Sequence, residues 1–457
     1  MVILLQRKIT EKLFAWKREK ERKALFVTGA RQIGKSYAIR EFGTTAYPVF
    51  VEVNLLENVR ARQALLEAAD AAEFTRRLSI LSQHELVPGQ TLIFIDEVQE
   101  APDIMTMAKF LVEDGRFDWA FSGSMLGTEL KGIRSYPVGY VHELTMRPLD
   151  FEEFCWAIGV TVDAMEEIGE ACADERPIAS YLHDAMLANF RTYVVVGGMP
   201  EVVQRFLDSG GDLSGIRALQ NELNAQYRRD ISKYAGSRAL YVQSIFDQLP
   251  VQLEGDTQKF VLNSIDPEAR YQKYQRDFVW LQNAGVGLKT DLVNEPKSPL
   301  LKTSQPSRFK LYQSDTGMLM ARYPISVAQA AYLDSKNPNL GGVYENIVAQ
   351  ELAAQGHELY YYMTKRRGEV DFMVDGPACS AIAIEVKSGS YYHSHAALDH
   401  VLDASEYGVE LGIVLSRGNV ERIGKVLYLP LYAVFCLSKY LDDELATQDF
   451  RLGVAAV

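Results

Sequence analysis

The eight residues GARQIGKS at positions 29–36 have the types and spacing of a loop that binds phosphate. Glycines allow backbone N–H groups to curl around phosphate oxygens, and Lys35 can reach the β- and γ-phosphates of a nucleotide. Ser36 can ligate Mg²⁺ at the N-terminus of the helix that should follow. The apolar run 25–27 precedes the loop, as a strand precedes a phosphate loop. Unless the segment is only a glycine-rich turn, the nucleotide should contact Gly29, Ala30, Arg31, Gln32, Ile33, Gly34, Lys35, Ser36 and Tyr37.

Two adjacent carboxylates, Asp96 and Glu97, follow the apolar run 92–95. A buried parallel strand would bring them to the edge of the sheet where its carboxyl end lies. We expect Asp96 to hold Mg²⁺ together with Ser36, and Glu97 to orient or deprotonate the attacking water. A protein that only binds nucleotide does not need the second carboxylate, so the pair favours hydrolysis. The alternative is that both acids only cap the next helix.

Small hydroxyl residues follow another expected strand, 119–121. Ser122 and Ser124 would lie beside the two carboxylates, and Ser124 is the expected sensor of the γ-phosphate, although Ser-Gly-Ser also forms ordinary turns. Further along the chain, Arg134 and Arg147 are candidates for an arginine finger, which would act on the nucleotide of a neighbouring copy. The alternative for both arginines is a solvated side chain.

A second group of chemically capable residues lies near the C-terminus. Its members are Glu345, Asp371, Glu385 and Lys387. We expect a helix around 343–346 and strands at 368–372 and 384–387. Residues i and i+2 of a strand share a face, so Glu369 should accompany Asp371, and Glu385 should accompany Lys387.

This combination suits metal-dependent cleavage of a phosphodiester bond. Asp371 and Glu385 would hold Mg²⁺, Lys387 would position the attacking water, and Glu345 would orient or share the metal. Burying several acids and a lysine is costly, which favours a metal or a ligand over packing alone. Two alternatives stay open: the same fold without cleavage, and a cluster of salt bridges.

The elements that must position these residues suggest an α/β protein of several domains. The chain has 457 residues, enough for roughly three domains of about 150 residues each. Short apolar runs alternate with helical segments between about 24 and 145, which is typical of a parallel sheet. Apolar residues recur at helical spacing from 150 to 253, and a small helix and hairpin module follows. The expected divisions are 1–150, 151–253, 254–330 and 331–457.

The charge is distributed unevenly along the chain. Residues 1–200 carry 22 Lys and Arg against 29 Asp and Glu, residues 201–330 carry 16 against 14, and residues 331–457 carry 10 against 17. The net charges are therefore -7, +2 and -7, which sum to -12. DNA contact, if it occurs, should involve residues 201–330 together with the C-terminal domain, and a coating of DNA by the whole surface is excluded.

Composition also bears on the cellular compartment of the protein. The four cysteines include no C-x-x-C pair, so the sequence suggests neither a disulfide framework nor a thiolate zinc site. No run approaches 18 apolar residues, and the apolar start at 1–5 is too short for a signal peptide. We expect a cytoplasmic protein without a membrane span.

Taken together, the motifs resemble those of prokaryotic AAA-type ATPases that carry a C-terminal domain of unknown function. The shared segments, in order, are GARQIGKS at 29–36, FIDEVQ at 94–99, FSGS at 121–124, RPLDFEEF at 147–154 and GGMPEVV at 197–203. The resemblance implies ATP and Mg²⁺ as cofactors and a winged-helix-like region at 254–330. Many members have Gly-Arg where Gly139 is followed by Tyr140, so Arg134 is the expected finger here.

The C-terminal acids resemble those of the PD-(D/E)xK nuclease superfamily, with Val370 where a proline is usual. The expected function is therefore a Mg²⁺-dependent ATPase whose nucleotide state controls a nuclease-like domain in a homo-oligomer. One alternative is an ATP-regulated DNA endonuclease. The other is a non-cleaving switch that binds DNA or a protein partner.

Overall fold

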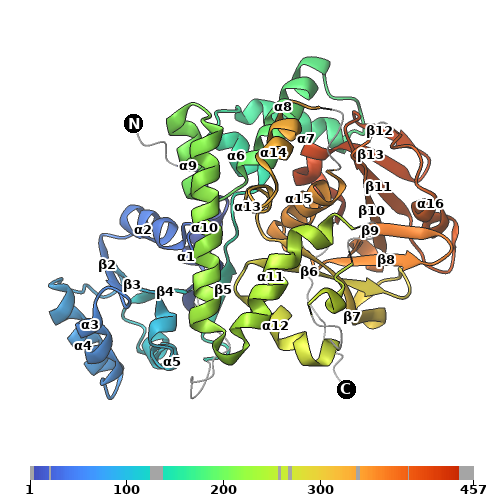
Figure 1. The fold of residues 1–457 in the computed structure, drawn as a ribbon. Helices are drawn as coiled ribbons and strands as arrows, with labels where there is room; N and C mark the ends of the chain where they lie inside the picture. The colour runs from blue at the N-terminus through green and yellow to red at the C-terminus, as the bar shows by residue number, and fades with distance from the viewer. Residues whose placement is uncertain are drawn as a thin grey trace, which may run out of the picture.

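The computed structural model describes residues 5–19, 22–123, 137–255, 259–265, 270–335, 340–389 and 391–441. Two sheets lie on either side of a helical region, which joins them (Figure 1). The α/β class expected from the sequence is confirmed: a parallel sheet, a helical middle and a C-terminal mixed sheet follow one another. In the described part of the chain, no helix is long and apolar enough to cross a bilayer.

The first sheet has five strands in the order β2-β3-β4-β1-β5, and every neighbouring pair is parallel. The strands are β1 (Ala24–Thr28), β2 (Val49–Asn54), β3 (Thr91–Asp96), β4 (Asp118–Gly123) and β5 (Val141–Thr145). Its helices are α1 (Ile9–Arg18), α2 (Lys35–Ala46), α3 (Val59–Leu66), α4 (Ala71–Ser82) and α5 (Ile104–Asp114). α1 and α2 cover one face and α3 to α5 the other, so β3 is buried throughout.

The chain between the sheets is helical, as its apolar spacing predicts. It comprises α6 (Phe151–Ala157), α7 (Val162–Ala173), α8 (Ser180–Val196), α9 (Pro200–Ser209), α10 (Leu213–Tyr234), α11 (Ala239–Leu253) and α12 (Tyr271–Asn283). An Asp150 and Glu153 capping box starts α6. The long helix α10 runs from α9 toward the first sheet and places its last turns beside the phosphate loop (Figure 1).

The second sheet has eight strands in the order β12-β13-β11-β10-β9-β8-β6-β7. The strands are β6 (Gly287–Val293), β7 (Ser304–Gln313), β8 (Tyr360–Thr364), β9 (Gly368–Asp375), β10 (Ala381–Val386), β11 (Leu411–Ser416), β12 (Glu421–Ile423) and β13 (Val426–Pro430). The helices α13 (Thr316–Met320) and α14 (Ile325–Tyr332) lie between β7 and β8 in sequence, and α17 (Ser438–Leu441) follows β13. The helices α15 (Gly341–Ala354) and α16 (Ala396–Asp403) cover opposite faces of the sheet.

The β6–β7 hairpin forms one edge of this second sheet. β6 pairs parallel with β8 and antiparallel with β7, so the sheet includes strands from both sides of residue 330. The four-part division of the chain, and the winged-helix-like character of 254–330, stay proposals. The hairpin belongs in sequence to the middle of the chain, but its hydrogen bonds connect it to the C-terminal strands.

Candidate functional site

The phosphate loop lies between β1 and α2, as its motif predicts. Lys35, the first residue of α2, is buried, and its Nζ donates to the carbonyl oxygens of Gly29 at 3.1 Å and Ala30 at 2.6 Å. Burial lowers the pKa of Lys35 to about 8, against the opposing effect of Glu97 and Asp96. The lysine is therefore held inside the loop that would surround a phosphate, at the place where a phosphate can replace the two carbonyls.

Asp96, the last residue of β3, accepts hydrogen bonds from three neighbouring side chains. Ser36 Oγ lies 3.0 and 2.9 Å from its two carboxylate oxygens, and Asn54 Nδ2 donates to Oδ2 at 3.0 Å. The hydroxyl of Ser122, a buried residue of β4, also donates to Oδ1. Hydroxyl and carboxylate oxygens are the ligands that Mg²⁺ prefers, so Ser36 and Asp96 fit this ion.

Glu97 directly follows β3 in a left-handed backbone conformation, with φ of +58°. Such a conformation is uncommon for a residue other than glycine and recurs at functional sites. Its N–H donates to Asp96 Oδ1 at 3.0 Å, and its side-chain Oε2 accepts from the Gln99 amide. The charge of Glu97 opposes the effect of burial on the pKa of Lys35 and also acts on Arg31, so this carboxylate lies next to the phosphate loop.

Helix α10 binds the phosphate loop from the outside. Arg31 donates to Asp230 Oδ1 at 2.7 Å and to the Tyr234 hydroxyl at 2.8 Å, and Tyr227 donates to the carbonyl of Arg31 at 3.3 Å. Tyr234 in turn donates to Glu100 Oε1, at 3.1 Å, just beyond Glu97. Arg31 thus belongs to the phosphate loop and its side chain also binds the helical middle of the protein.

The turn between α12 and β6 makes a second contact with the phosphate loop. Gly285, with φ of +70°, approaches Ala30 so closely that an added Cβ would lie 2.9 Å from the Ala30 nitrogen. No side chain fits there without moving the loop or the turn. The chain that leads into the β6–β7 hairpin therefore rests directly on the phosphate loop.

A cavity of about 380 Å³ opens on the other side of the loop. Its walls combine the N-terminal segment, the phosphate loop with the start of α2, and the start of α9. The lining residues are Leu5, Arg7, Thr10, Gln32, Gly34, Tyr37, Ala38, Glu41, Met146, Pro200, Glu201 and Gln204. Its apolar walls next to the phosphate loop suit a flat heterocyclic base.

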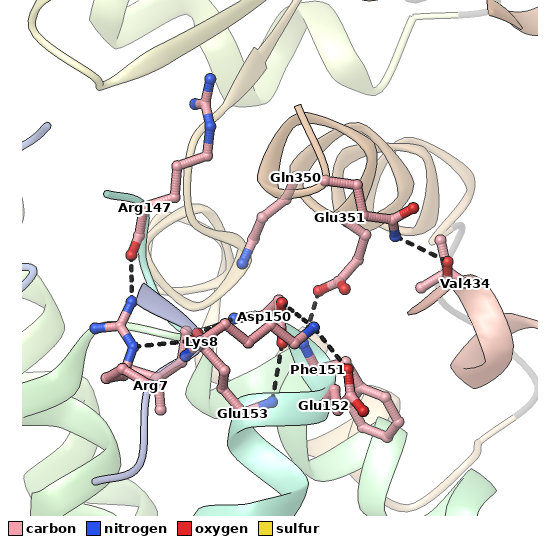
Figure 2. A network of polar contacts seen from close by, with 12 residues as sticks. Arg7, Lys8, Arg147, Asp150, Phe151, Glu152, Glu153, Gln350, Glu351 and Val434 are labelled. Atoms are coloured by element: carbon pink, nitrogen blue, oxygen red, sulfur yellow. Dashed lines mark hydrogen bonds and ion pairs between the residues drawn. The ribbon is translucent and has the colours of Figure 1, made fainter. Parts of the chain in front are cut away.

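The RPLDFEEF segment joins three parts of the chain by polar contacts (Figure 2). Lys8 pairs with Asp150 at 2.6 Å, and Arg7 with Glu153 at 3.2 Å. The backbone N–H of Phe151 donates at 2.9 Å to Glu351, a buried carboxylate on α15. The motif therefore anchors the N-terminal segment and α15, which covers one face of the C-terminal sheet, to the start of α6, and this gives it a structural role.

Of the two arginines expected as fingers, the structure describes only Arg147. Arg134 and the sensor Ser124 lie outside the described residues. The Arg147 carbonyl accepts from Arg7 at 2.6 Å, while its guanidinium points away from the Asp150 contacts (Figure 2). Burial lowers the pKa of Arg147.

Four further residues lie at the site: Ser122, Asn54, Asp230 and Gly285. Of these, the sequence indicated only Ser122, as a small hydroxyl residue after an expected strand.

The four expected C-terminal residues do converge. Glu345 comes from α15, Asp371 from β9, Glu385 from β10, and Lys387 from just after β10. Lys387 Nζ lies 2.7 Å from Glu385 Oε1, and the Val386 N–H donates to Asp371 Oδ2 at 2.7 Å. Burial, reinforced by Glu345 and Glu385, raises the pKa of Asp371 well above its ordinary value. The acids are therefore close enough to repel one another.

A buried lysine that the sequence analysis did not include lies among these acids. Lys310 of β7 is fully buried, and its Nζ is 2.9 Å from Glu345 Oε2, 2.5 Å from Glu369 Oε1 and 3.8 Å from Asp371 Oδ1. Tyr312, two residues along β7, donates to Glu345 Oε2 at 2.8 Å. In the described ranges, no three His, Cys, Asp or Glu side chains are arranged to hold a metal ion.

Comparison with protein families assigns three segments of the chain. Residues 21–155 match the model described as an AAA domain. Residues 187–329 and 340–434 match two models, DUF8612 and DUF4143, each described as a domain of unknown function. The chain therefore combines an AAA-type P-loop ATPase domain with two domains whose functions are unknown. A comparison with curated proteins gives no match.

Solved structures give only distant likenesses. The Walker-type ATPase PABY2304 of Pyrococcus abyssi is 10% identical with a TM-score of 0.42, covering 70% of this chain and 96% of its own. The Aeropyrum pernix ORC1 protein in complex with DNA is 12% identical with a TM-score of 0.29, covering 73% and 94%. PCH-2 of C. elegans is 12% identical with a TM-score of 0.26, covering 44% and 60%. Because these scores are low, none of them carries a conclusion about this chain.

Proposed function

We propose that the protein is a Mg²⁺-dependent ATPase whose nucleotide state is transmitted to its C-terminal domain. The observation that carries the ATPase part is the contact of Ser36 with Asp96 beside the buried Lys35. A hydroxyl and an ammonium group of the phosphate loop thus lie beside a carboxylate at the end of β3, and this set of groups binds a metal-bound triphosphate. The base would occupy the cavity next to Tyr37 and Pro200.

Each residue has a separate task in this proposal. Lys35 exchanges the carbonyls of Gly29 and Ala30 for phosphate oxygens, and Glu97 orients the attacking water and accepts its proton. Ser36 and Asp96 would hold Mg²⁺, which when bound neutralises charge on the β- and γ-phosphate oxygens.

Transmission to the C-terminal domain is supported by the two ends of the β6–β7 region. At one end Gly285 contacts Ala30 of the phosphate loop, and at the other Lys310 lies among the C-terminal acids. β6 also pairs with β8 in the C-terminal sheet. A shift of the phosphate loop on nucleotide binding would therefore move a hairpin that is hydrogen-bonded to that sheet. A DNA partner, contacted through residues 201–330 and the C-terminal domain, and assembly into a homo-oligomer complete the proposal.

The test is phosphate release and nucleotide binding by purified variants. Lys35→Ala should abolish ATP binding, because it removes the charge that faces the phosphates. Glu97→Gln should bind ATP but lose turnover, since the amide accepts no proton. Glu166→Gln, on the exposed surface of α7, is the matched control and should hydrolyse ATP like wild type. Equal turnover in Glu97→Gln and wild type would refute the assignment of Glu97.

The rival function, ATP-regulated DNA cleavage, is favoured by the convergence of Asp371, Glu385 and Lys387. It would require a divalent cation at these acids. Nicking of supercoiled DNA with Mg²⁺ or Mn²⁺, lost in Lys387→Ala, would support it.

A further inference from the structure

The position of Lys310 determines what the C-terminal acid cluster can hold. This cluster is defined here by Glu345, Glu369, Asp371 and Glu385, which come from α15, β9 and β10. A divalent ion bound here would be coordinated directly by carboxylate oxygens; for Mg²⁺ the distance from the ion to each oxygen is about 2.0–2.1 Å. The Lys310 ammonium already lies between oxygens of Glu345 and Glu369, at 2.9 and 2.5 Å, with Asp371 at 3.8 Å.

One oxygen of each carboxylate in the cluster already has a donor, whereas Glu369 Oε2 and Glu385 Oε2 are buried without a hydrogen-bond partner in the described part of the chain. Glu345 Oε2 accepts from both Lys310 and Tyr312, Asp371 Oδ2 accepts from the Val386 N–H, and Glu385 Oε1 accepts from Lys387. A metal ion bound through the paired oxygens would have to displace these donors, and an ion bound through the two unpaired oxygens would still be repelled by the ammonium of Lys310. The residues present therefore do not fit a divalent ion as they are arranged.

The Lys310 side chain is fully buried, so the carboxylates around it take the place of water as partners of its ammonium group. A fully buried lysine without these acids would be strongly destabilising, and so would the acids without the lysine. The lysine comes from the β6–β7 hairpin and the acids from later elements, so this ion-pair network attaches the hairpin to the C-terminal sheet.

We propose that Lys310 supplies, from within the chain, the cation of the C-terminal acid cluster, so that the cluster binds no divalent metal while β7 is in place. The carboxylates of this cluster then attach the β6–β7 hairpin to the C-terminal sheet, and the cluster offers no site for metal-dependent cleavage. Loss of the lysine, by mutation or by movement of β7, removes the one positive charge from among these acids and leaves its place free for a metal ion.

The experiment is Mn²⁺ binding to the full chain without nucleotide, measured by electron paramagnetic resonance of the free ion. Wild type and Lys310→Arg, which keeps the positive charge, should show only the Mn²⁺ binding of the rest of the molecule, the phosphate-loop site included. Lys310→Gln should bind one Mn²⁺ at least about tenfold more tightly, or about 1.4 kcal/mol. Lys310→Gln with Glu345→Gln should lose this gain. All variants keep the same phosphate loop, so any Mn²⁺ that binds at the loop is the same in each and cancels in the comparison.

Two results would overturn the proposal. One is Mn²⁺ binding by wild type that Glu385→Gln abolishes, because the cluster would then hold a metal beside Lys310. The other is a folded Lys310→Gln protein, judged by circular dichroism, that gains no Mn²⁺ site. If Lys310→Gln does not fold, the comparison of wild type with Glu385→Gln decides: equal binding supports the proposal. None of these outcomes depends on whether the protein hydrolyses ATP.

Discussion

The contact between Gly285 and the phosphate loop yields the sharpest prediction. Gly285 has φ of +70°, and a Cβ added there would lie 2.9 Å from the Ala30 nitrogen, 3.1 Å from its Cβ and 3.2 Å from its Cα. Two of these atoms belong to the backbone, which cannot rotate away as a side chain can. We therefore expect Gly285→Ala to push the loop and the β6–β7 hairpin apart.

The magnitude has two parts. The left-handed conformation costs an alanine about 1–2 kcal/mol relative to glycine. The forced contact with Ala30 adds about 1–3 kcal/mol, the usual cost of overpacking a close-packed site. The free energy of unfolding should fall by the sum. Nucleotide binding must bring the displaced loop back to its wild-type position. If this costs only about 1.4 kcal/mol of the strain, the affinity for nucleotide falls tenfold.

The assay is the dissociation constant of a fluorescent ADP analogue, together with urea unfolding of the free protein. Gly89→Ala is the matched control: Gly89 lies in the turn before β3 with φ of +72°, and an added Cβ would meet nothing within 4 Å. This variant should lose about 1–2 kcal/mol of stability and keep the wild-type affinity. Equal affinity in the two variants would show that the turn does not act on the phosphate loop, and the proposed transmission would fail.

Two further predictions concern pH. Because the pKa of Lys35 is lowered to about 8 and phosphate binds its charged form, nucleotide affinity should fall about tenfold per pH unit above 8; a flat Kd between pH 7 and 9.5 would contradict this. Burial raises the pKa of Asp315 from 3.8 to about 6, although the N–H groups of Gly198, Met318 and Gly317 oppose the shift. The folded state thus binds this proton more tightly, and the Asp315 contribution to stability should rise by about 2 kcal/mol as pH falls from 6 to 4. Urea unfolding of wild type and Asp315→Asn over this range should show the difference, and parallel profiles would refute it.

The parts of the site that lie close together in sequence could be predicted. The phosphate loop and the two carboxylates after β3 depend on local patterns: a buried strand followed by residues of fixed type and spacing. β1 extends the expected run 25–27 by one residue at each end, and β3 extends the expected run 92–95 in the same way. Local alternation likewise places Asp371 and Glu385 on neighbouring strands.

The contacts that connect distant segments could not be predicted in this way. Arg31 and Asp230 are 199 residues apart, and Asp230 stands in a charged stretch that reads as a solvated helix face. Gly285 carries no signal of its own, since a glycine after a helix is common at helix ends. Such pairs follow from how the helical middle folds back on the first sheet, which no short window of sequence contains.

Lys310 shows that a net charge counted along the chain differs from the charge of the surface which that segment exposes. The excess of 16 basic over 14 acidic residues in 201–330 predicted DNA contact there. Lys310 is one of those 16 residues, yet it is fully buried among acids of the C-terminal segment. Leaving it out lowers the excess from +2 to +1, and pairing it with the C-terminal acids lowers their deficit from -7 to -6. Part of the charge asymmetry along the chain is thus used inside the molecule. A buried lysine in the apolar run 309–312 demands a carboxylate partner, and that demand is the one signal by which the sequence could have located this contact.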